Sequence, residues 1–186
     1  MPAAAYTILL YLHLLGAITL FSTLSVQWIG SQMIRGATRV ETCQFAIRIT
    51  RRLPILYSIG TTSLLLAGAG MVSTRWAWNA PWVIAALVTV VTLALIGTFG
   101  NARRQAAALD PVRSAPPGPI PPTVRDGLHD PLLWRSENIL FGIMAGALWL
   151  MAARPASWII CVAALAAGAA IGLLVAHLTM HPAASD

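Results

Sequence analysis

The sequence predicts an all-α protein, a multi-pass transmembrane helical bundle with five spans, its N-terminus outside and its C-terminus inside. Hydrophobic residues make up 58% of the 186 residues, and Asp, Glu, Lys and Arg together only 10%, whereas soluble domains carry about 45–50% and about 25%. Five apolar stretches reach the roughly 20 residues that a helix needs to cross a bilayer. The arginines concentrate in two of the segments between these stretches. Two cysteines and four histidines exclude a disulfide scaffold and a zinc-finger array.

The predicted spans form one membrane domain, residues 1–186, and cover residues 6–30, 54–74, 82–100, 132–153 and 157–178. Each must be helical, because a lone segment in lipid satisfies its backbone hydrogen bonds only as a helix. Short links predict that spans two and three, and spans four and five, form antiparallel hairpins. The first span is expected to be retained and not cleaved as a signal peptide, since no basic residue precedes it and no A-x-A site follows it.

The arginines predict the orientation. All twelve basic residues are arginines, and ten of them lie in the segment that follows span one, in the segment that follows span three or at the start of span four. These ten are Arg35, Arg39, Arg48, Arg51, Arg52, Arg103, Arg104, Arg113, Arg125 and Arg135, whereas the other connections hold Arg75 and Arg154. The positive-inside rule therefore puts the two arginine-rich segments in the cytoplasm. The net charge of +6 then sets orientation and does not indicate nucleic-acid binding. Tryptophans are expected in an outer belt (Trp76, Trp78, Trp82, Trp149 and Trp158) and at the inner surface (Trp28 and Trp134).

The first cytoplasmic segment, residues 38–52, predicts an amphipathic helix. Thr38 and Glu41 have the spacing of a capping box. An apolar face of Val40, Cys43, Ala46 and Ile47 follows at helical spacing. We expect this helix to lie on the inner surface with Arg48, Arg51 and Arg52 facing the anionic headgroups of membrane lipids. The alternative is that it extends the first span into solvent.

The second cytoplasmic segment, residues 105–127, holds six of the twelve prolines. Such a run is expected to be an extended, semi-rigid polyproline linker and not a helix. Its P-x-x-P pattern leaves a docking ligand as the alternative to a plain connector. Asp130 and Pro131 have the residue types of an N-cap and a first helical position, and they predict the start of the fourth span.

His13 is the only ionisable side chain deep in the first span, and ionisable groups inside a membrane are candidates for function. Gly16 and Ala17 share its face and would let another helix approach closely, so His13 should face protein. The favoured interpretation is a packed, hydrogen-bonded histidine. Axial ligation of a b-type haem and contact with a solute are the alternatives, and Met71, Met144 or Met151 could supply a second haem ligand.

Polar residues at the inner end of the fourth span form a second candidate site. A carboxylate inside a membrane helix needs a partner, and we expect Glu137 to form an ion pair with Arg103 or Arg104. A metal site would also draw on His129 and Asp130, but it needs at least three converging ligands. Small residues predict helix packing at Gly142, Gly146, Ala164, Gly168, Gly172 and Ala176. They would join the last two spans, or alternatively a homo-oligomer or a membrane partner subunit.

No sequence motif of an enzyme is present: there is no P-loop, no dinucleotide-binding glycine pattern, no G-x-S-x-G and no H-E-x-x-H. The other spans lack core carboxylates, which disfavours a proton pump. The sequence therefore predicts an accessory or structural membrane component without catalysis and without a required cofactor. A haem b or redox protein using His13 is the alternative, and a small-solute or metal transporter comes third.

Several short stretches resemble a bacterial family of integral membrane proteins catalogued as domain of unknown function 2269. They are residues 12–17 (LHLLGA), 76–83, 130–134 (DPLLW) and 148–155 (LWLMAARP). Their order and spacing are similar to that family's, although Arg154 stands where the family usually has lysine. The resemblance implies a multi-helix fold in the bacterial inner membrane. It implies no activity and no functional residue.

Overall fold

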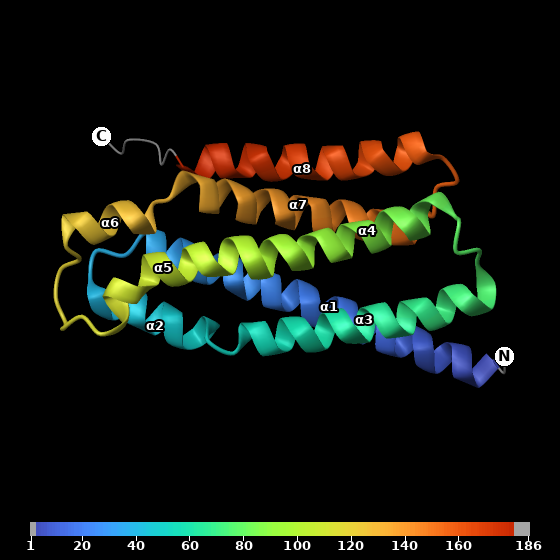
Figure 1. Ribbon diagram of the computed structural model, residues 1–186, viewed down its shortest axis with the longest axis horizontal. Helices are drawn as coiled ribbons and strands as arrows, with labels where there is room; N and C mark the ends of the chain where they lie inside the picture. Colours follow the sequence, from blue (N-terminus) through green and yellow to red (C-terminus); the bar gives the residue numbers. More distant parts are fainter. Residues whose placement is uncertain (1–2, 181–186) are drawn as a thin grey trace. The chain divides into compact units, whose positions relative to one another are not determined.

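The computed structural model describes residues 3–180, and this part of the chain consists of helices and the segments that connect them, without a strand (Figure 1). The elements are α1 (Ala3–Arg35), α2 (Val40–Thr50), α3 (Leu53–Arg75), α4 (Pro81–Leu95), the π-helix η1 (Ile96–Asn101), α5 (Ala102–Arg113), α6 (Pro122–Leu128), α7 (Pro131–Ala153) and α8 (Trp158–Met180). Five helical stretches in it are long and apolar enough to cross a membrane: Ala3–Arg35, Val40–Arg75, Pro81–Arg113, Val124–Ala153 and Trp158–Thr179. The all-α prediction with five apolar helices is confirmed.

The chain divides into two compact units. The first contains the residues up to Trp78 together with Val112–Pro121, and the second contains Asn79–Pro111 and the residues from Pro122 onward. The first unit thus includes α1, α2, α3 and part of the proline-rich segment. The second includes α4, η1, most of α5, and α6, α7 and α8.

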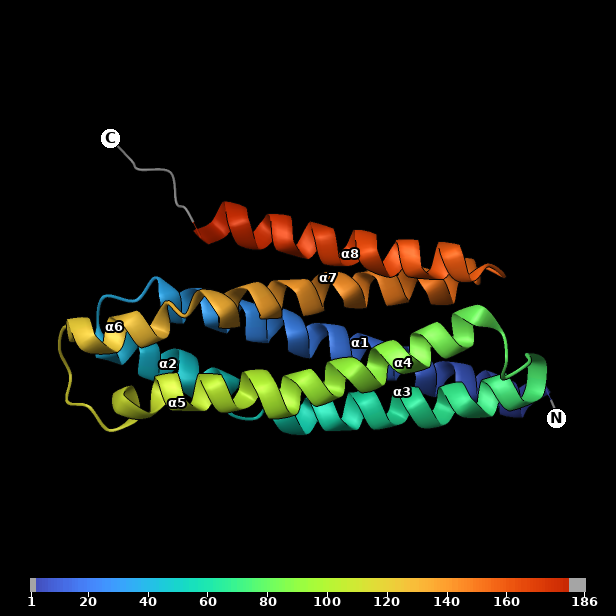
Figure 2. The same ribbon diagram turned by 45° about the horizontal axis from the view of Figure 1, so that its top comes forward.

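In the first unit, α1 and α3 run antiparallel with their backbones almost in contact. A Cβ atom added at Gly16 would lie 2.7 Å from the backbone nitrogen of Leu64 and 2.9 Å from the carbonyl oxygen of Gly60. At the far end of α1, α2 packs against it through Val40, Cys43 and Ala46, all of which are buried. Both ribbon views show α2 and then α3 following one another along α1 (Figures 1 and 2).

In the second unit, α7 and α8 form the closest helix pair. Added Cβ atoms at Gly142 and Gly168 would collide with each other's backbone, and one at Gly172 would collide with the carbonyl of Asn138. At Gly146 an added Cβ would lie 2.8 Å from the carbonyl oxygen of Ala164. These small residues let dispersion contacts between the two backbones replace side-chain packing. Toward the other end of the pair, Ala85 of α4 joins Leu150 and Cys161 in a buried cluster.

The expectation that residues 105–127 form an extended linker throughout is wrong. Helix α5 continues to Arg113 with Pro111 inside it, and α6 occupies Pro122–Leu128. Alanines 106–108 and Leu109 favour helix, and α5 continues two residues past Pro111. Pro122 begins α6 at the first helical position, which tolerates proline.

The expected capping box at Thr38 is also wrong. Helix α2 begins at Val40, and its N-cap is Arg39, which has extended dihedral angles (φ −127°, ψ 144°) and makes no side-chain cap. The backbone of Thr38 is used elsewhere, since its carbonyl oxygen accepts a hydrogen bond of 3.1 Å from the backbone N–H of Ile120. Glu41 binds the side chain of Arg39 at 2.8 Å instead of reaching back to Thr38. A long-range backbone pairing therefore replaces the local cap.

The glycine contact of α7 and α8 yields a prediction for stability. Gly142→Ala places a methyl group against the carbonyl of Gly168, and overpacking of this kind costs about 1–3 kcal/mol. We expect a lower thermal midpoint in detergent, followed by circular dichroism. Gly127→Ala is the matched control, because nothing lies within 4 Å of the added Cβ. An unchanged thermal midpoint for Gly142→Ala would show that α7 and α8 can move apart without loss of stability.

Candidate functional site

His13 joins α1 to α3 by a hydrogen bond to the backbone. Its Nδ1 lies 3.0 Å from the carbonyl oxygen of Leu64. A carbonyl oxygen only accepts, so this bond assigns the proton to Nδ1 and leaves the lone pair of the neutral ring on Nε2. Gly68 makes room for the ring, since a Cβ added there would lie 3.2 Å from both Nδ1 and Cε1 of His13. His13 thus faces α3, and the structure has the packed, hydrogen-bonded arrangement that the sequence favoured.

A second bond in the opposite direction lies next to the histidine. Ser63 of α3 donates through its hydroxyl to the carbonyl oxygen of Leu12 on α1, at 3.0 Å. Each helix therefore supplies one polar side chain to a backbone carbonyl of the other. In an apolar environment such paired bonds satisfy groups that would otherwise be costly to bury.

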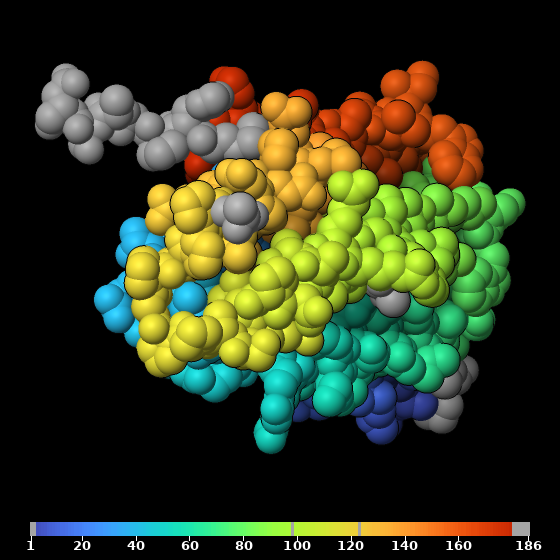
Figure 3. Space-filling view, turned by 60° about the vertical axis from the view of Figure 1, so that its left-hand side comes forward, coloured from blue at the N-terminus to red at the C-terminus, as the bar shows by residue number. Residues whose placement is uncertain are grey.

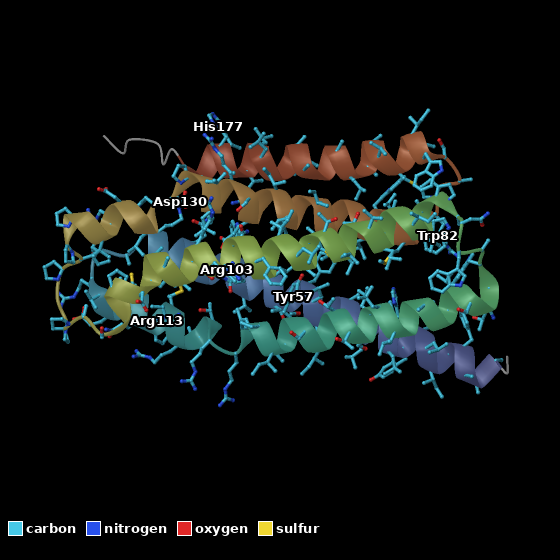
Figure 4. The ribbon with its side chains drawn as sticks, viewed as in Figure 1. Tyr57, Trp82, Arg103, Arg113, Asp130 and His177 are labelled. Atoms are coloured by element: carbon cyan, nitrogen blue, oxygen red, sulfur yellow. The ribbon has the colours of Figure 1, made fainter. Side chains whose placement is uncertain are left out.

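The methionines considered as second haem ligands lie in different units. Met71 is buried on α3, in the unit that contains His13, whereas Met144 is buried on α7 and Met151 is half-buried on the same helix. Two further histidines, His129 and His177, belong to the second unit. His129 binds the carbonyl oxygen of Arg125 at 2.8 Å, and His177 projects from α8 (Figure 4). Within residues 3–180, no three His, Cys, Asp or Glu side chains are grouped so as to hold a metal ion.

The polar residues of the second unit gather where α7 begins. Asp130 caps α7, with Oδ1 accepting from the backbone N–H groups of Leu132 (2.8 Å) and Leu133 (3.4 Å). Its other oxygen lies 3.6 Å from a guanidinium nitrogen of Arg104. The Arg104 and Asp130 side chains are 52% and 30% exposed, so this pair contributes little to stability, about 0–1 kcal/mol. The predicted cap by Asp130 is confirmed.

The residues predicted to form an ion pair lie in the same region. Arg104 contacts Asp130, and the guanidinium carbon of Arg103 lies 5.8 Å from the ring centre of Phe99 (Figure 4). Glu137 is half-buried one and a half turns into α7. Its pairing with Arg103 or Arg104 stays a prediction.

Buried polar groups connect the start of α7 to its neighbours. Ser136 donates to the side-chain oxygen of Asn101 at 2.9 Å, which ties α7 to the end of the π-helix η1. The indole of Trp134 is 1% exposed and donates to the hydroxyl of Thr179 on α8 at 3.0 Å. Asn138 is 3% exposed and donates to the carbonyl oxygen of Trp134 at 2.8 Å. These bonds fix the polar end of the second unit, and the sequence did not predict the role of η1.

A third group of residues was missed by sequence analysis. Residues 112–121, here named the strap, lie against α2 (Figure 3). Val40 donates its backbone N–H to the carbonyl oxygen of Gly118 at 2.9 Å, and Arg39 and Pro119 form an antiparallel bridge. Val112 and Ile120 are buried, at 1% and 5% exposed. These two apolar residues within a proline-rich run were the available signal.

Side chains of α2 and its cap hold the strap as well. Gln44 donates from Nε2 to the carbonyl oxygens of Val112 (3.2 Å) and Ala115 (3.0 Å). Glu41 accepts from the backbone N–H of Gly118 at 3.4 Å and from the side chain of Arg39. The hydrogen bond between Arg39 and Glu41 raises the pKa of the Arg39 guanidinium. The strap is therefore a docked segment and not a free linker between Arg113 and Pro122.

Comparison of the chain with protein-family models, with curated proteins and with solved structures finds no match.

The strap yields a second prediction. Gln44→Ala removes two hydrogen bonds from the strap, each worth about 0.5–1.5 kcal/mol. We expect the amide of Ile120, which is bonded to Thr38, to exchange with deuterium roughly tenfold faster, because the strap opens more often. Thr42→Ala on the exposed side of α2 is the control and should leave the exchange rate unchanged. Equal protection in both variants would contradict the role given to Gln44.

Proposed function

We propose that this protein is an accessory component of the bacterial inner membrane, related to the family of domain of unknown function 2269, with no catalysis of its own. The observation that carries this proposal is the use of His13. His13, the one histidine in residues 6–30, which hold no Asp, Glu, Lys or Arg, is bonded to the carbonyl of Leu64 and packed over Gly68. A group held in this way serves helix pairing.

The exposed apolar surface supports insertion into a membrane. Large apolar side chains on the long helices remain exposed, among them Ile159 (81%), Leu66 (70%) and Ile18 (64%). In water each Å² of such surface is unfavourable by about 25 cal/mol relative to an apolar environment. Lipid removes this cost, and it leaves the polar groups of the helices bonded within the protein.

The arginines support an orientation with the N-terminus outside. In the first unit, Arg35, Arg39, Arg48, Arg51 and Arg52 lie at the end opposite to Arg75, since α1 and α3 are antiparallel. In the second unit, the arginines of α5, α6 and the start of α7 precede the α7 span, and Arg154 follows it. Under the positive-inside rule both arginine-rich ends face the cytoplasm.

A b-type haem protein is the second candidate, and one observation favours it. Metal-bound histidines usually donate their other ring nitrogen to a carbonyl or carboxylate. His13 already donates from Nδ1 to Leu64, which leaves Nε2 as the nitrogen that could bind iron.

A visible spectrum separates the two candidates. We expect the protein purified in detergent to show no Soret band, oxidised or reduced, and His13→Ala to lower stability by roughly 0.6–1.7 kcal/mol, the range of hydrogen bonds between membrane helices. Leu14→Ala is the control, because Leu14 is 52% exposed. A Soret band that His13→Ala abolishes would contradict the proposed accessory function and support a haem protein.

Cysteine labelling tests the orientation. Asn79 lies between α3 and α4, and Ser114 follows α5, and both are exposed. We expect an impermeant maleimide to label Asn79→Cys in intact bacteria and Ser114→Cys only after lysis. The two native cysteines are buried, and the parent protein measures their background. The reverse labelling pattern would refute the proposed orientation.

A further inference from the structure

The register of α1 and α3 fixes which residues share a level along the first unit. Tyr6 lies against Trp76, with ring centres 6.4 Å apart, and a Cβ added at Gly30 would lie 2.5 Å from the methyl carbon of Thr50. From Tyr6 to Trp28 the helix rises about 33 Å. This matches the roughly 30 Å of hydrocarbon that interfacial aromatic residues flank.

The break between α2 and α3 lies at the same level along the first unit as Trp28. Since Gly30 lies against Thr50 and the helices are antiparallel, Trp28 is level with Arg51 and Arg52. Arg48 lies about one turn further from the hydrocarbon. The headgroup layer is roughly 5–8 Å thick on each side. All three arginines are therefore level with headgroups, and all three are exposed.

The apolar face of α2 that the sequence identified packs within the protein, and the exposed face carries the arginines. Val40, Cys43 and Ala46 are buried within the first unit. The exposed side carries Phe45 (49% exposed) and Ile49 (45%). Together with Arg48 and Arg52 they are spaced as i, i+4, i+3 and i+7, which places all four on one stripe of a helix. The stripe combines two apolar side chains with two cations.

Within residues 3–180, no ion pair neutralises the arginines of this stripe. Glu41 is the only acidic residue between Val40 and Arg75, and it binds Arg39 at 2.8 Å. Among the described residues, the ion pairs of Arg39 with Glu41 and of Arg104 with Asp130 involve none of Arg48, Arg51 and Arg52. The stripe therefore presents a local excess of positive charge at the level of the headgroups.

We propose that Phe45, Arg48, Ile49 and Arg52 form a binding surface for an anionic phospholipid. The guanidinium groups bind the lipid phosphate. Ile49 and Phe45 lie further from the hydrocarbon than Arg52, so they flank the headgroup of the bound lipid and not its acyl chains. Helix α2 is held between α1 and the strap, so the surface is ordered before lipid binds and little entropy is lost. The inference rests on the membrane insertion described under the proposed function.

The test measures lipid retention by native mass spectrometry in a neutral detergent. Phosphatidylglycerol, phosphatidylcholine with the same acyl chains, and water-soluble glycerol 3-phosphate are added separately. We expect the parent protein to retain phosphatidylglycerol in preference to the other two. The double variant Arg48→Gln/Arg52→Gln should bind it about 20-fold more weakly, because each arginine near an anionic surface contributes roughly fivefold.

Matched variants decide what the loss means. Arg113→Gln/Arg125→Gln removes the same charge from exposed positions and should leave the retention of phosphatidylglycerol unchanged. Phe45→Ser should weaken the retention of phosphatidylglycerol and leave the helicity of the protein intact. Equal retention by the parent and Arg48→Gln/Arg52→Gln, equal loss in the control pair, or equal binding of glycerol 3-phosphate would each overturn the proposal. Because lipid binding in detergent does not depend on orientation in the cell, its failure is distinct from a reversed cysteine-labelling pattern.

Discussion

The contact of α1 with α3 at Gly16 and Gly60 fixes the geometry of the first unit. With no side chain at either position, the two backbones meet, and an added Cβ at Gly16 would lie 2.7 Å from the nitrogen of Leu64. Once this point is fixed, the rise of 1.5 Å per residue determines every other level. It brings His13 to the carbonyl of Leu64 and Gly30 to Thr50. The register of α1 against α3 also determines which arginines lie at the end of the apolar zone.

Several hydroxyl groups in the helices donate to carbonyl oxygens of the backbone. Thr23 donates to the carbonyl oxygen of Thr19 at 2.7 Å, and Thr89 donates to that of Ala85 at the same distance. Both bonds stay within one turn of the donor's own helix, as expected for hydroxyls in an apolar environment. Ser63 and His13 differ, since their acceptors lie on the neighbouring helix. These two bonds therefore give the first pair of helices its specificity.

Periodicity and composition predicted the five apolar helices, the protein-facing side of His13 and the Asp130 cap, because each depends on residues within a few turns. The strap could not be predicted in this way. Its bonds join Val40 to Gly118 and Gln44 to Val112, and local patterns carry no information about partners so distant in sequence. The count of prolines was also misleading, because Pro122 begins α6, where proline is tolerated, and α5 continues through Pro111. The untested Glu137 pair depends on side-chain positions that spacing alone does not determine.

The position of the strap in the sequence has a consequence for biosynthesis. During translation α1, α2 and α3 leave the ribosome first, whereas Val112 follows at the end of α5 and Ile120 comes after α5. Until then, the side of α2 that receives Val112 and Ile120 is uncovered, and Gln44 lacks its two carbonyl acceptors. The long helices of the first unit can pair early. The first unit completes its folding only after α4, η1 and α5 have been made. Folding of the N-terminal helices thus depends on synthesis of a segment about 70 residues further along the chain.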